Sequence, residues 1–293
     1  MSEIATWPEW AEKISEPGVY DMPDELYHLD PVEGGSLSSS GARKLLPPHC
    51  PAIYKHERDN PPAPKKHFDI GHAAHKLVLG SGPELVRIDA ERWDTNKVKA
   101  EVAAVRADGA IPLKPGEYQQ VHDMADAIRK HRIAGALFDP EHGQPEQSLI
   151  WQDGPTKVWR RARFDWLPDV TEGRLIIPDY KTSHSADPGA IARTVYQYGY
   201  YQQAAWYLDG AEALGLGEDL AFLFVVQSKD APYLITVVEL RRTALRVGRE
   251  RNRQALEVYA ECVATCHWPA HSDEIELISL PAWVENDYLQ EAS

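Results

Sequence analysis

Two carboxylates and one amine, Asp165, Asp179 and Lys181, lie close together near the middle of the chain. Alternating polar and apolar residues over 157–167 and a mainly apolar run over 173–181 predict two β-strands around them. Asp179 and Lys181 are two residues apart, so their side chains share one face of the second strand. The turn between the strands is short, which predicts that they are antiparallel neighbours whose charged ends converge at one point.

Such a group of side chains suits the hydrolysis of phosphodiesters. Carboxylate oxygens are the ligands that Mg²⁺ prefers, usually with several waters retained. The metal polarises a phosphate and lowers the pKa of a bound water. An ammonium group can orient or deprotonate that water and stabilise the charge that develops on the phosphate. A D-x-K pattern by itself is more often a solvated strand end with a salt bridge, so the assignment depends on the features around it.

The periodicity of the whole chain predicts an α/β fold with a central mixed sheet flanked by helices. Asp187-Pro188 is a typical helix start, with an N-cap followed by proline, and 81–114 is rich in loops. The predicted helices cover 42–46, a short piece after Pro51, 69–79, 96–106, 115–133, 187–210 and 241–267; the predicted strands cover 146–152, 157–167, 173–181, 220–227 and 233–240; a Pro-rich loop covers 57–66.

The chain of 293 residues is long enough for one large domain or two small ones, and 43% of it is hydrophobic. We expect an irregular N-terminal arm over 1–35, a single domain over 36–285 and a C-terminal tail over 286–293. No apolar run approaches the roughly 20 residues that span a bilayer, and the N-terminus lacks the features of a secretory signal. These features predict a cytoplasmic protein without a membrane segment.

The net charge of −14 taken alone argues against a nucleic-acid partner, because phosphate contacts require Lys and Arg. It does not exclude one, since a basic groove can lie within an acidic protein and metal-binding carboxylates add negative charge. The three cysteines, Cys50, Cys262 and Cys266, are too few for a cluster held by four thiolates. We therefore expect no iron–sulfur cluster.

Several segments together resemble the PD-(D/E)xK nuclease superfamily and, more narrowly, the RecE-type exonucleases (exodeoxyribonuclease VIII) of phages and prophages. Each segment is weak evidence alone, but their order and spacing over about 17–285 are fairly specific. They are Cys50-Pro51-Ala52-Ile53-Tyr54, Gly71-His72-Ala73-Ala74-His75, Glu146, Arg163-Phe164-Asp165, Asp179-Tyr180-Lys181 and the stretch from Tyr200 to Tyr207 with its Q-x-x-x-Y pattern.

The resemblance implies a role for each matching position. It makes Lys181 the catalytic lysine, with Glu146 an acidic residue near the site. His72 competes with His75 as the histidine ligand. Arg43 could equally be a solvated helix arginine, and Arg163 could simply line the sheet. The helix with Gln203 and Tyr207 could also serve packing alone, through a buried stripe of Tyr196, Tyr200, Ala204 and Tyr207. The implied metal ligands are His75, Asp165, Asp179 and the backbone carbonyl of Tyr180, and the implied DNA contacts are Gln203, Tyr207, Arg43 (to a terminal 5′-phosphate) and Arg163.

The resemblance also implies a restriction-endonuclease-like core and a reaction. The expected activity is Mg²⁺-dependent exonuclease digestion, 5′→3′, of linear double-stranded DNA ends, with Mn²⁺ a possible substitute. It implies a RecT-type single-strand annealing partner, a ring-shaped homo-oligomer and a role in recombination. Alternatives are a Cas4-like or RecB-like nuclease without an iron–sulfur cluster, a catalytically inactive DNA-binding or scaffold protein of the same fold, and an unrelated metal hydrolase.

Overall fold

The computed structural model describes residues 8, 11–60, 70–170, 173–282 and 284–285. Part of the predicted Pro-rich loop, 61–66, and the expected tail, 286–293, lie outside these residues. The helices are α1 (Asp24–His28), α2 (Ser39–Lys44), α3 (Pro51–Asp59), α4 (Ile70–Leu79), α5 (Asn96–Ala107), α6 (Pro115–Lys130), α7 (Ala134–Leu137), α8 (Pro188–Tyr198), α9 (Tyr200–Ala213) and α10 (Arg242–Thr265). The strands are β1 (Gly18–Tyr20), β2 (Leu37–Ser38), β3 (Leu85–Arg87), β4 (Ile111–Leu113), β5 (Gly143–Gln152), β6 (Trp159–Pro168), β7 (Arg174–Ser183), β8 (Asp219–Ser228) and β9 (Ile235–Glu239).

The first sheet is built on the hairpin of β5 and β6. Along β6, residues 160, 162, 164 and 166 are buried and the residues between them are partly exposed, as the alternating sequence predicts. The strand order is β1-β5-β6-β2, with β1 and β6 antiparallel to β5 and β2 parallel to β6. Residues 18–20 of the expected N-terminal arm therefore form an edge of this sheet.

The second sheet contains β7, β8 and β9, and it corrects one prediction. Over ten residues β7 pairs in parallel with β8, and β9 runs antiparallel to β8. The strands β6 and β7 are spatial neighbours but form no ladder with each other in the described part of the chain. The expectation of antiparallel pairing was wrong because the two helices after β7 bring the almost wholly buried strand β8 beside it, and such two-sided burial is typical of parallel strands.

The crossover from β7 to β8 also differs from the prediction. We expected one helix over 187–210, but the chain forms α8 and α9, separated at Gly199. Gly199 has a φ of 69°, a left-handed conformation that glycine adopts without strain and that ends α8. The break gives the two helices different directions, so residues on either side of Gly199 do not continue one helical face.

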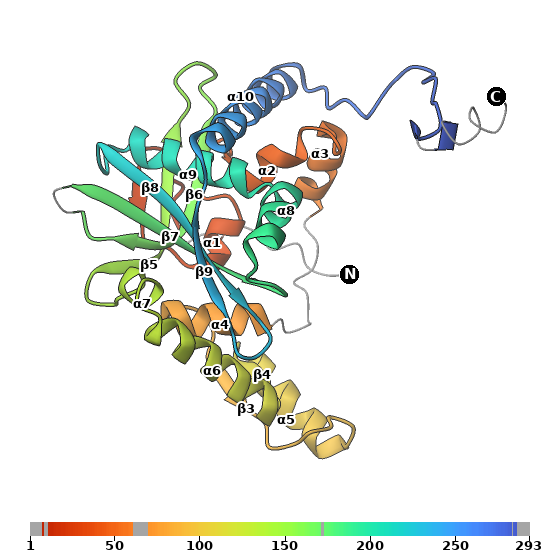
Figure 1. Cartoon of the computed structure of the whole chain (residues 1–293). Coiled ribbons are helices and arrows are strands. Elements are labelled where there is room, and N and C mark those ends of the chain that lie inside the picture. Colours follow the sequence, from red (N-terminus) through yellow and green to blue (C-terminus); the bar gives the residue numbers. More distant parts are fainter. Residues whose placement is uncertain (1–7, 9–10, 61–69, 171–172, 283, 286–293) are drawn as a thin grey trace, which may run out of the picture.

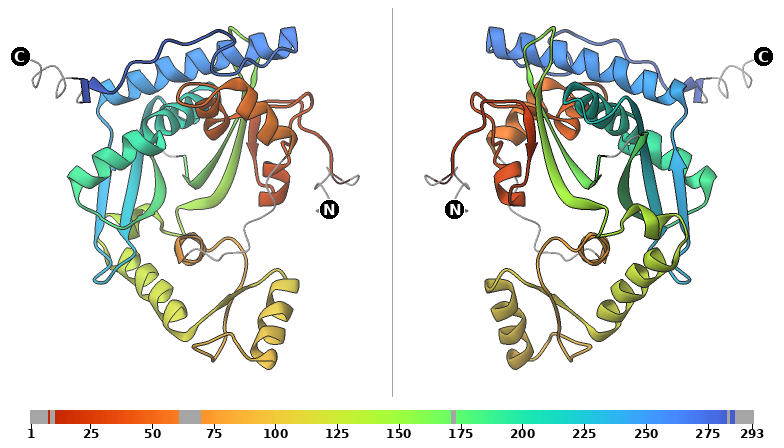
Figure 2. Two further views of the ribbon diagram at one scale, coloured as in Figure 1. Left: turned by 90° about the vertical axis from the view of Figure 1, so that its right-hand side faces the viewer. Right: turned by 90° about the vertical axis from the view of Figure 1, so that its left-hand side faces the viewer.

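Helices cover both sides of the strands, as the views of Figures 1 and 2 show: α9 and α10 lie on one side, α4 and α6 on the other. The larger hydrophobic core joins β5, β6, β7 and β8 to α2, α9 and α10, with Trp206 and Phe224 fully buried. A second core joins α4, α6 and α7 to Trp166, Tyr180 and Val225. The predicted mixed α/β architecture is confirmed, with the strands divided between sheets.

The segment 81–114 carries more structure than predicted. The predicted helix is present as α5. The strand before it, β3, and the strand after it, β4, pair with each other as a two-stranded parallel sheet. The sheet packs against α6, where Leu113 and Val121 are fully buried beside Ala73 of α4. Strands of three residues are too short for a period-2 pattern to be recognised in the sequence.

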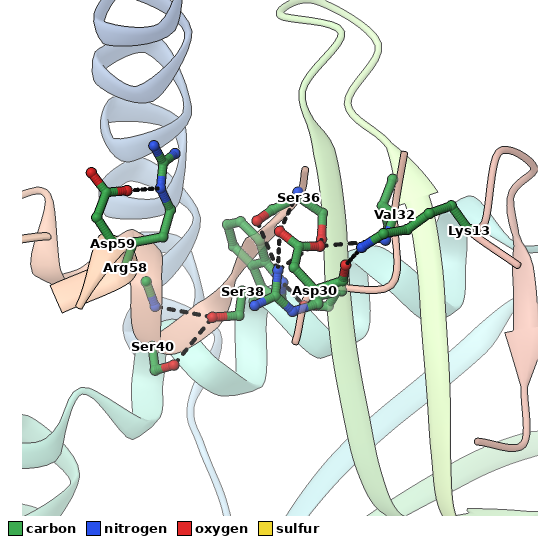
Figure 3. Close-up of polar contacts among 11 residues, drawn as sticks. Lys13, Asp30, Val32, Ser36, Ser38, Ser40, Arg58 and Asp59 are labelled. Atoms are coloured by element: carbon green, nitrogen blue, oxygen red, sulfur yellow. Dashed lines mark hydrogen bonds and ion pairs between the residues drawn. The ribbon is translucent and has the colours of Figure 1, made fainter. Parts of the chain in front are cut away.

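Polar contacts connect the N-terminal arm to the first sheet (Figure 3). The Asp30 carboxylate accepts hydrogen bonds from the backbone N–H (2.8 Å) and the hydroxyl (2.6 Å) of Ser36, and Lys13 donates to the Asp30 carbonyl. Arg161 of β6 forms an ion pair with Asp30 (3.1 Å) and donates to Ser36. These contacts fix α1 and the start of α2 next to β6.

The C-terminal part begins with α10, which ends at Thr265, two residues before the predicted end. Cys266 follows with a positive φ and is exposed, so it does not share a helix face with the buried Cys262. Just beyond α10, Trp268 stacks on Tyr54 of α3 and the Pro269 carbonyl accepts a hydrogen bond from the Ala52 N–H. The exposed segment that follows leads away from the body of the molecule (Figure 1). Within the described residues, no helix has the length and apolar character needed to cross a membrane.

Candidate active site

A hydrogen bond joins the two sheets at the predicted carboxylates. The backbone N–H of Tyr180 on β7 donates to Oδ2 of Asp165 on β6, at 2.7 Å. In a strand the N–H and C=O of one residue point to the same side, so the Tyr180 carbonyl also faces β6. Asp165, the Tyr180 backbone and the flanking Asp179 and Lys181 therefore meet where the edges of the two sheets approach each other.

Asp179 is the most deeply buried of these groups, with 1% of its side chain exposed. Its Oδ1 accepts a hydrogen bond from Gln203 Nε2 of α9 at 2.7 Å. Its Oδ2 forms an ion pair with the Lys181 ammonium and is without a hydrogen bond of good geometry among the described residues. Burial and the Asp165 charge raise the pKa of Asp179 to about 7, although Lys181 acts in the opposite direction.

Lys181 is held between charge and an aromatic face. Its Nζ lies 5.5 Å from the centroid of the Tyr200 ring, a cation–π distance. Burial alone would lower the pKa of Lys181, but the Asp179 and Asp165 carboxylates outweigh it and raise the pKa. The amine is therefore cationic at neutral pH in this arrangement, a point charge next to the two carboxylates.

His75 of α4 completes the group from the other side. Its Nε2 lies 3.3 Å from Asp165 Oδ2 and its Nδ1 lies 3.5 Å from Glu146 Oε1. Burial would lower the pKa of His75, but Asp165 and Glu146 together raise it. In return, His75 and Lys181 outweigh burial and lower the pKa of Asp165. The competing candidate, His72, is exposed on the same helix.

Glu146 occupies the position of β5 that faces Asp165. The pairs on either side of it are Pro145 with Trp166 and Gln147 with Phe164, so the register sets Glu146 opposite Asp165. Its φ of 56° is unusual for a residue with a side chain, and such conformations concentrate at functional sites. Burial raises the pKa of Glu146, an effect that the hydrogen bond from Arg163 opposes.

The three other predicted contacts lie around this group, and their DNA-binding roles stay predictions. Arg163 is largely engaged by the protein: besides Glu146 it donates to the Met22 carbonyl at 3.0 Å. Arg43 of α2 donates to the Tyr198 carbonyl. Tyr207 stacks on Phe164, with ring centroids 5.1 Å apart. All three line the same cleft as His75 and Asp165.

This cleft has a volume of about 1760 Å³. It runs between the N-terminal arm, the start of α2, α4 and the junction of α8 and α9, and the candidate site forms part of its wall. Two features of the wall were missed in the sequence analysis. Asp24 of α1 lies 3.8 Å from Arg163, and the residues around Gly199 form an aromatic rim. Neither position has a sequence signal beyond residue type, because tertiary folding alone brings them to the site.

The donor atoms fit a hard divalent cation by their chemistry. Two carboxylates, an imidazole and a backbone carbonyl are typical ligands of Mg²⁺ or Mn²⁺. Asp179 Oδ2 is buried and, apart from its ion pair with Lys181, has no hydrogen-bond partner of good geometry in the described part of the chain. In the present side-chain arrangement, no three His, Cys, Asp or Glu side chains of the described residues converge as a metal-binding group. The oxygens are engaged by His75, Lys181 and Gln203, and a cation would compete with these partners.

The chain belongs to the family described as "PDDEXK-like domain of unknown function (DUF3799)", whose model matches residues 38–281. Among solved structures it is similar to a protein from Eubacterium rectale described as "Putative exonuclease", with 11% identity, a TM-score of 0.53, and coverage of 86% of this chain and 92% of that one. A "phage related exonuclease" from Haemophilus somnus 129PT also matches, with 11% identity, a TM-score of 0.31, and coverage of 66% and 95%. No curated protein matches the chain.

The family match and the first of these structures bear on the fold. They agree with the predicted PD-(D/E)xK-type core of a mixed sheet with helices on its faces. The particular RecE-type resemblance stays a prediction, because these matches do not separate it from other branches with the same core. Membership of a PDDEXK-like family, together with Asp165, Asp179 and Lys181 at one place, supports a nuclease.

Proposed function

We propose that this protein is a metal-dependent DNA exonuclease. The observation that carries the proposal is the convergence of Asp165, Asp179 and Lys181 beside His75, next to a large cleft that Asp165 and His75 line. Phosphodiester hydrolysis requires stabilisation of negative charge on the phosphate and an activated water. The buried carboxylates, the imidazole and the cationic amine supply groups for both requirements within one site.

Asp165, Asp179, His75 and the Tyr180 carbonyl would hold the divalent cation, Mg²⁺ or Mn²⁺. When bound, such a cation polarises a phosphate oxygen and makes a bound water more acidic. Lys181 places its positive charge beside the carboxylates, where it stabilises a phosphate that enters the site. Gln203 holds Asp179 in position through Oδ1, and burial of Asp179, with 1% of its side chain exposed, keeps bulk water away from it.

The finer properties follow from the resemblance described above and belong to the same proposal. We propose 5′→3′ digestion of linear duplex ends that leaves a 3′ single strand, with Arg43 at a terminal 5′-phosphate. A RecT-type annealing protein would receive that strand in recombination. A closed homo-oligomeric ring around the duplex would make digestion processive.

The test is the digestion of a linear duplex labelled at either the 5′ or the 3′ end, with Mg²⁺, Mn²⁺ or EDTA. Wild type is compared with Lys181→Ala and Asp179→Ala, and Arg241→Ala serves as a control on an exposed residue outside the site. We expect metal-dependent loss of nucleotides from the 5′ end, absent in both site variants and unchanged in the control.

Each other outcome of this assay has a definite meaning. Loss from the 3′ end retains the nuclease and overturns the polarity. No cleavage by wild type with either metal contradicts the enzyme and favours a DNA-binding or scaffold protein. Equal cleavage by wild type and both site variants contradicts the assignment of the active site.

A further inference from the structure

An aromatic rim lies at the junction of α8 and α9 and extends from the surface to the candidate active site. Among the residues that the structure describes, Tyr196 and Tyr198 are the only Tyr, Trp or Phe side chains exposed by more than a third, at 79% and 52%. Exposed aromatic side chains next to a cleft are typical of ligand-binding surfaces. The buried stripe considered in the sequence analysis is therefore wrong at Tyr196, because α8 ends before the stripe continues into α9.

The exposed rings rest on a second aromatic layer. Tyr198 stacks on Tyr200 with centroids 6.0 Å apart and planes inclined by 26°, and Tyr200 stacks on the fully buried Phe224 at 5.2 Å. Tyr196 stacks in the same way on Tyr201, at 6.5 Å and 10°. Each outer ring therefore packs on a less exposed ring and keeps more than half of its own surface open to solvent.

This stack leads directly to the reactive group. Tyr198 and Tyr200 line the cleft, and the Tyr200 ring lies 5.5 Å from Lys181 Nζ. The Tyr198 carbonyl accepts a hydrogen bond from Arg43, and a Cβ at Gly199 would lie 2.6 Å from Arg43 Cδ, so a larger residue there would displace the Arg43 side chain. A flat group stacked on the outer face of Tyr198 would be separated from Tyr200 only by the Tyr198 ring, and Tyr200 is the ring that contacts Lys181.

The charge of the cleft explains why such a surface is useful. Its lining carries five carboxylates and only three Lys or Arg side chains, so attraction of phosphates is weak. Stacking of a base on an aromatic ring does not depend on net charge, and every base has a π-face. Bases inside a duplex are already stacked and paired, so this contact selects an unpaired strand. The five carboxylates are Asp21, Asp24, Glu25, Glu146 and Asp165, and the three cations are Arg43, Lys76 and Arg163.

We propose that Tyr198 and Tyr196, supported by Tyr200 and Tyr201, form a stacking platform for the bases of an unpaired nucleic-acid strand at the entrance to the cleft. The inference rests on the proposed nuclease function and adds a substrate feature to it. Tyr198, nearest the cleft, makes the main contact, and Tyr196 extends the platform outward. The platform orients the strand so that a phosphate close to the stacked base faces Lys181.

The test is equilibrium binding of the full chain to short labelled oligonucleotides in EDTA, where metal-dependent cleavage cannot occur. An oligothymidylate is compared with an abasic oligomer of the same length, which keeps the phosphates and lacks the bases. Tyr198→Leu and Tyr198→Trp form a matched pair of similar apolar character that differs in the aromatic ring. Leu234→Ala, which changes another exposed residue on the turn between β8 and β9, is the control.

We expect wild type to bind oligothymidylate at least about tenfold more tightly than the abasic oligomer, the lower part of the range for one stacked base. Tyr198→Leu should remove about tenfold of that preference and Tyr198→Trp should restore it, with abasic binding unchanged throughout. An oligouridylate bound like oligothymidylate extends the platform to RNA. Equal affinity for oligothymidylate and abasic oligomer, or an unchanged preference in Tyr198→Leu, overturns the proposal.

The duplex digestion assay separates this inference from the proposed function. If wild type digests the duplex but binds the two oligomers equally, the nuclease proposal is supported and the stacking platform is contradicted. If binding depends on the aromatic ring at position 198 but no digestion occurs, the stacking platform is supported and the nuclease proposal is contradicted. Thermal unfolding of Tyr198→Leu should match wild type, since the side chain is more than half exposed.

Discussion

Gln203 Nε2 donates a hydrogen bond to Asp179 Oδ1 at 2.7 Å, which links helix α9 to the buried carboxylate of β7. Because Asp179 has 1% of its side chain exposed, no water can replace this donor without rearrangement. Gln203 is thus a positioning residue for the predicted ligand Asp179, in addition to any contact with DNA. Partners that hold metal ligands in this way typically change metal affinity or activity by 10–100-fold when removed.

We therefore predict that Gln203→Ala raises the Mg²⁺ concentration needed for half-maximal digestion by about 10–100-fold. The maximal rate at saturating metal should fall much less. Gln203→Glu should be worse, because it places a second negative charge beside Asp179. The measurement is the initial rate against metal concentration. A loss of rate that no metal concentration relieves, with an unchanged half-maximal concentration, would show that Gln203 acts elsewhere.

A second prediction separates metal ligands from the catalytic amine. The Lys181 ammonium occupies Asp179 Oδ2, which a cation would also require. Lys181→Ala should therefore bind Mn²⁺ at least as tightly as wild type while losing digestion. Asp165→Ala and Asp179→Ala should lose both. Isothermal titration with Mn²⁺ measures binding without DNA, and weaker binding by Lys181→Ala than by wild type would contradict this competition.

The left-handed residue between α8 and α9 gives a prediction about stability. Gly199→Ala should lower the free energy of unfolding by about 2 kcal/mol, from the positive φ of 69° and from the close approach to Arg43. Gly154→Ala is the control, because Gly154 has open space around its Cβ position and should change stability little. Urea denaturation measures both variants. Equal stability of Gly199→Ala and wild type would mean that the junction adapts.

Asp153 provides a prediction about pH that is independent of the active site. Burial raises its pKa, but Arg253, which donates to both carboxylate oxygens at 2.8 Å, and Thr156 outweigh burial and lower the pKa to about 2. A carboxyl whose pKa is lower in the folded state stabilises the fold above its unfolded pKa of about 3.9. That contribution decreases as the pH falls from about 5 toward 2.

Asp153→Asn should accordingly lower the free energy of unfolding at pH 7 by about 1–2 kcal/mol, a value reduced by solvent around the partly exposed Arg253. The difference from wild type should shrink at pH 3. Urea unfolding of both proteins at the two pH values measures it. A difference that is the same at pH 7 and pH 3 would assign the effect to packing rather than to charge.

The elements that position the site could be predicted where the sequence has a strong period. Strands β5, β6, β7 and β8 agree with the predicted ranges to within a few residues, because alternation or a buried apolar run marks each of them. The pairing of β7 with β8, in place of the expected pairing with β6, could not be predicted, since β7 has two possible neighbours and burial of β8 decides between them. The break at Gly199 was hidden because apolar residues continue in helical spacing on both sides of it.

By itself the sequence determined which residue types are available for chemistry and the local periods of most of the elements that carry them, since backbone alternation and helical spacing depend on neighbouring residues. It therefore indicated Asp165, Asp179 and Lys181. Only the tertiary structure decided that Glu146 faces Asp165 and that Tyr198 stands at the cleft. The reason is that strand register and helix packing depend on burial summed over residues far apart in the chain, and no local pattern records that sum.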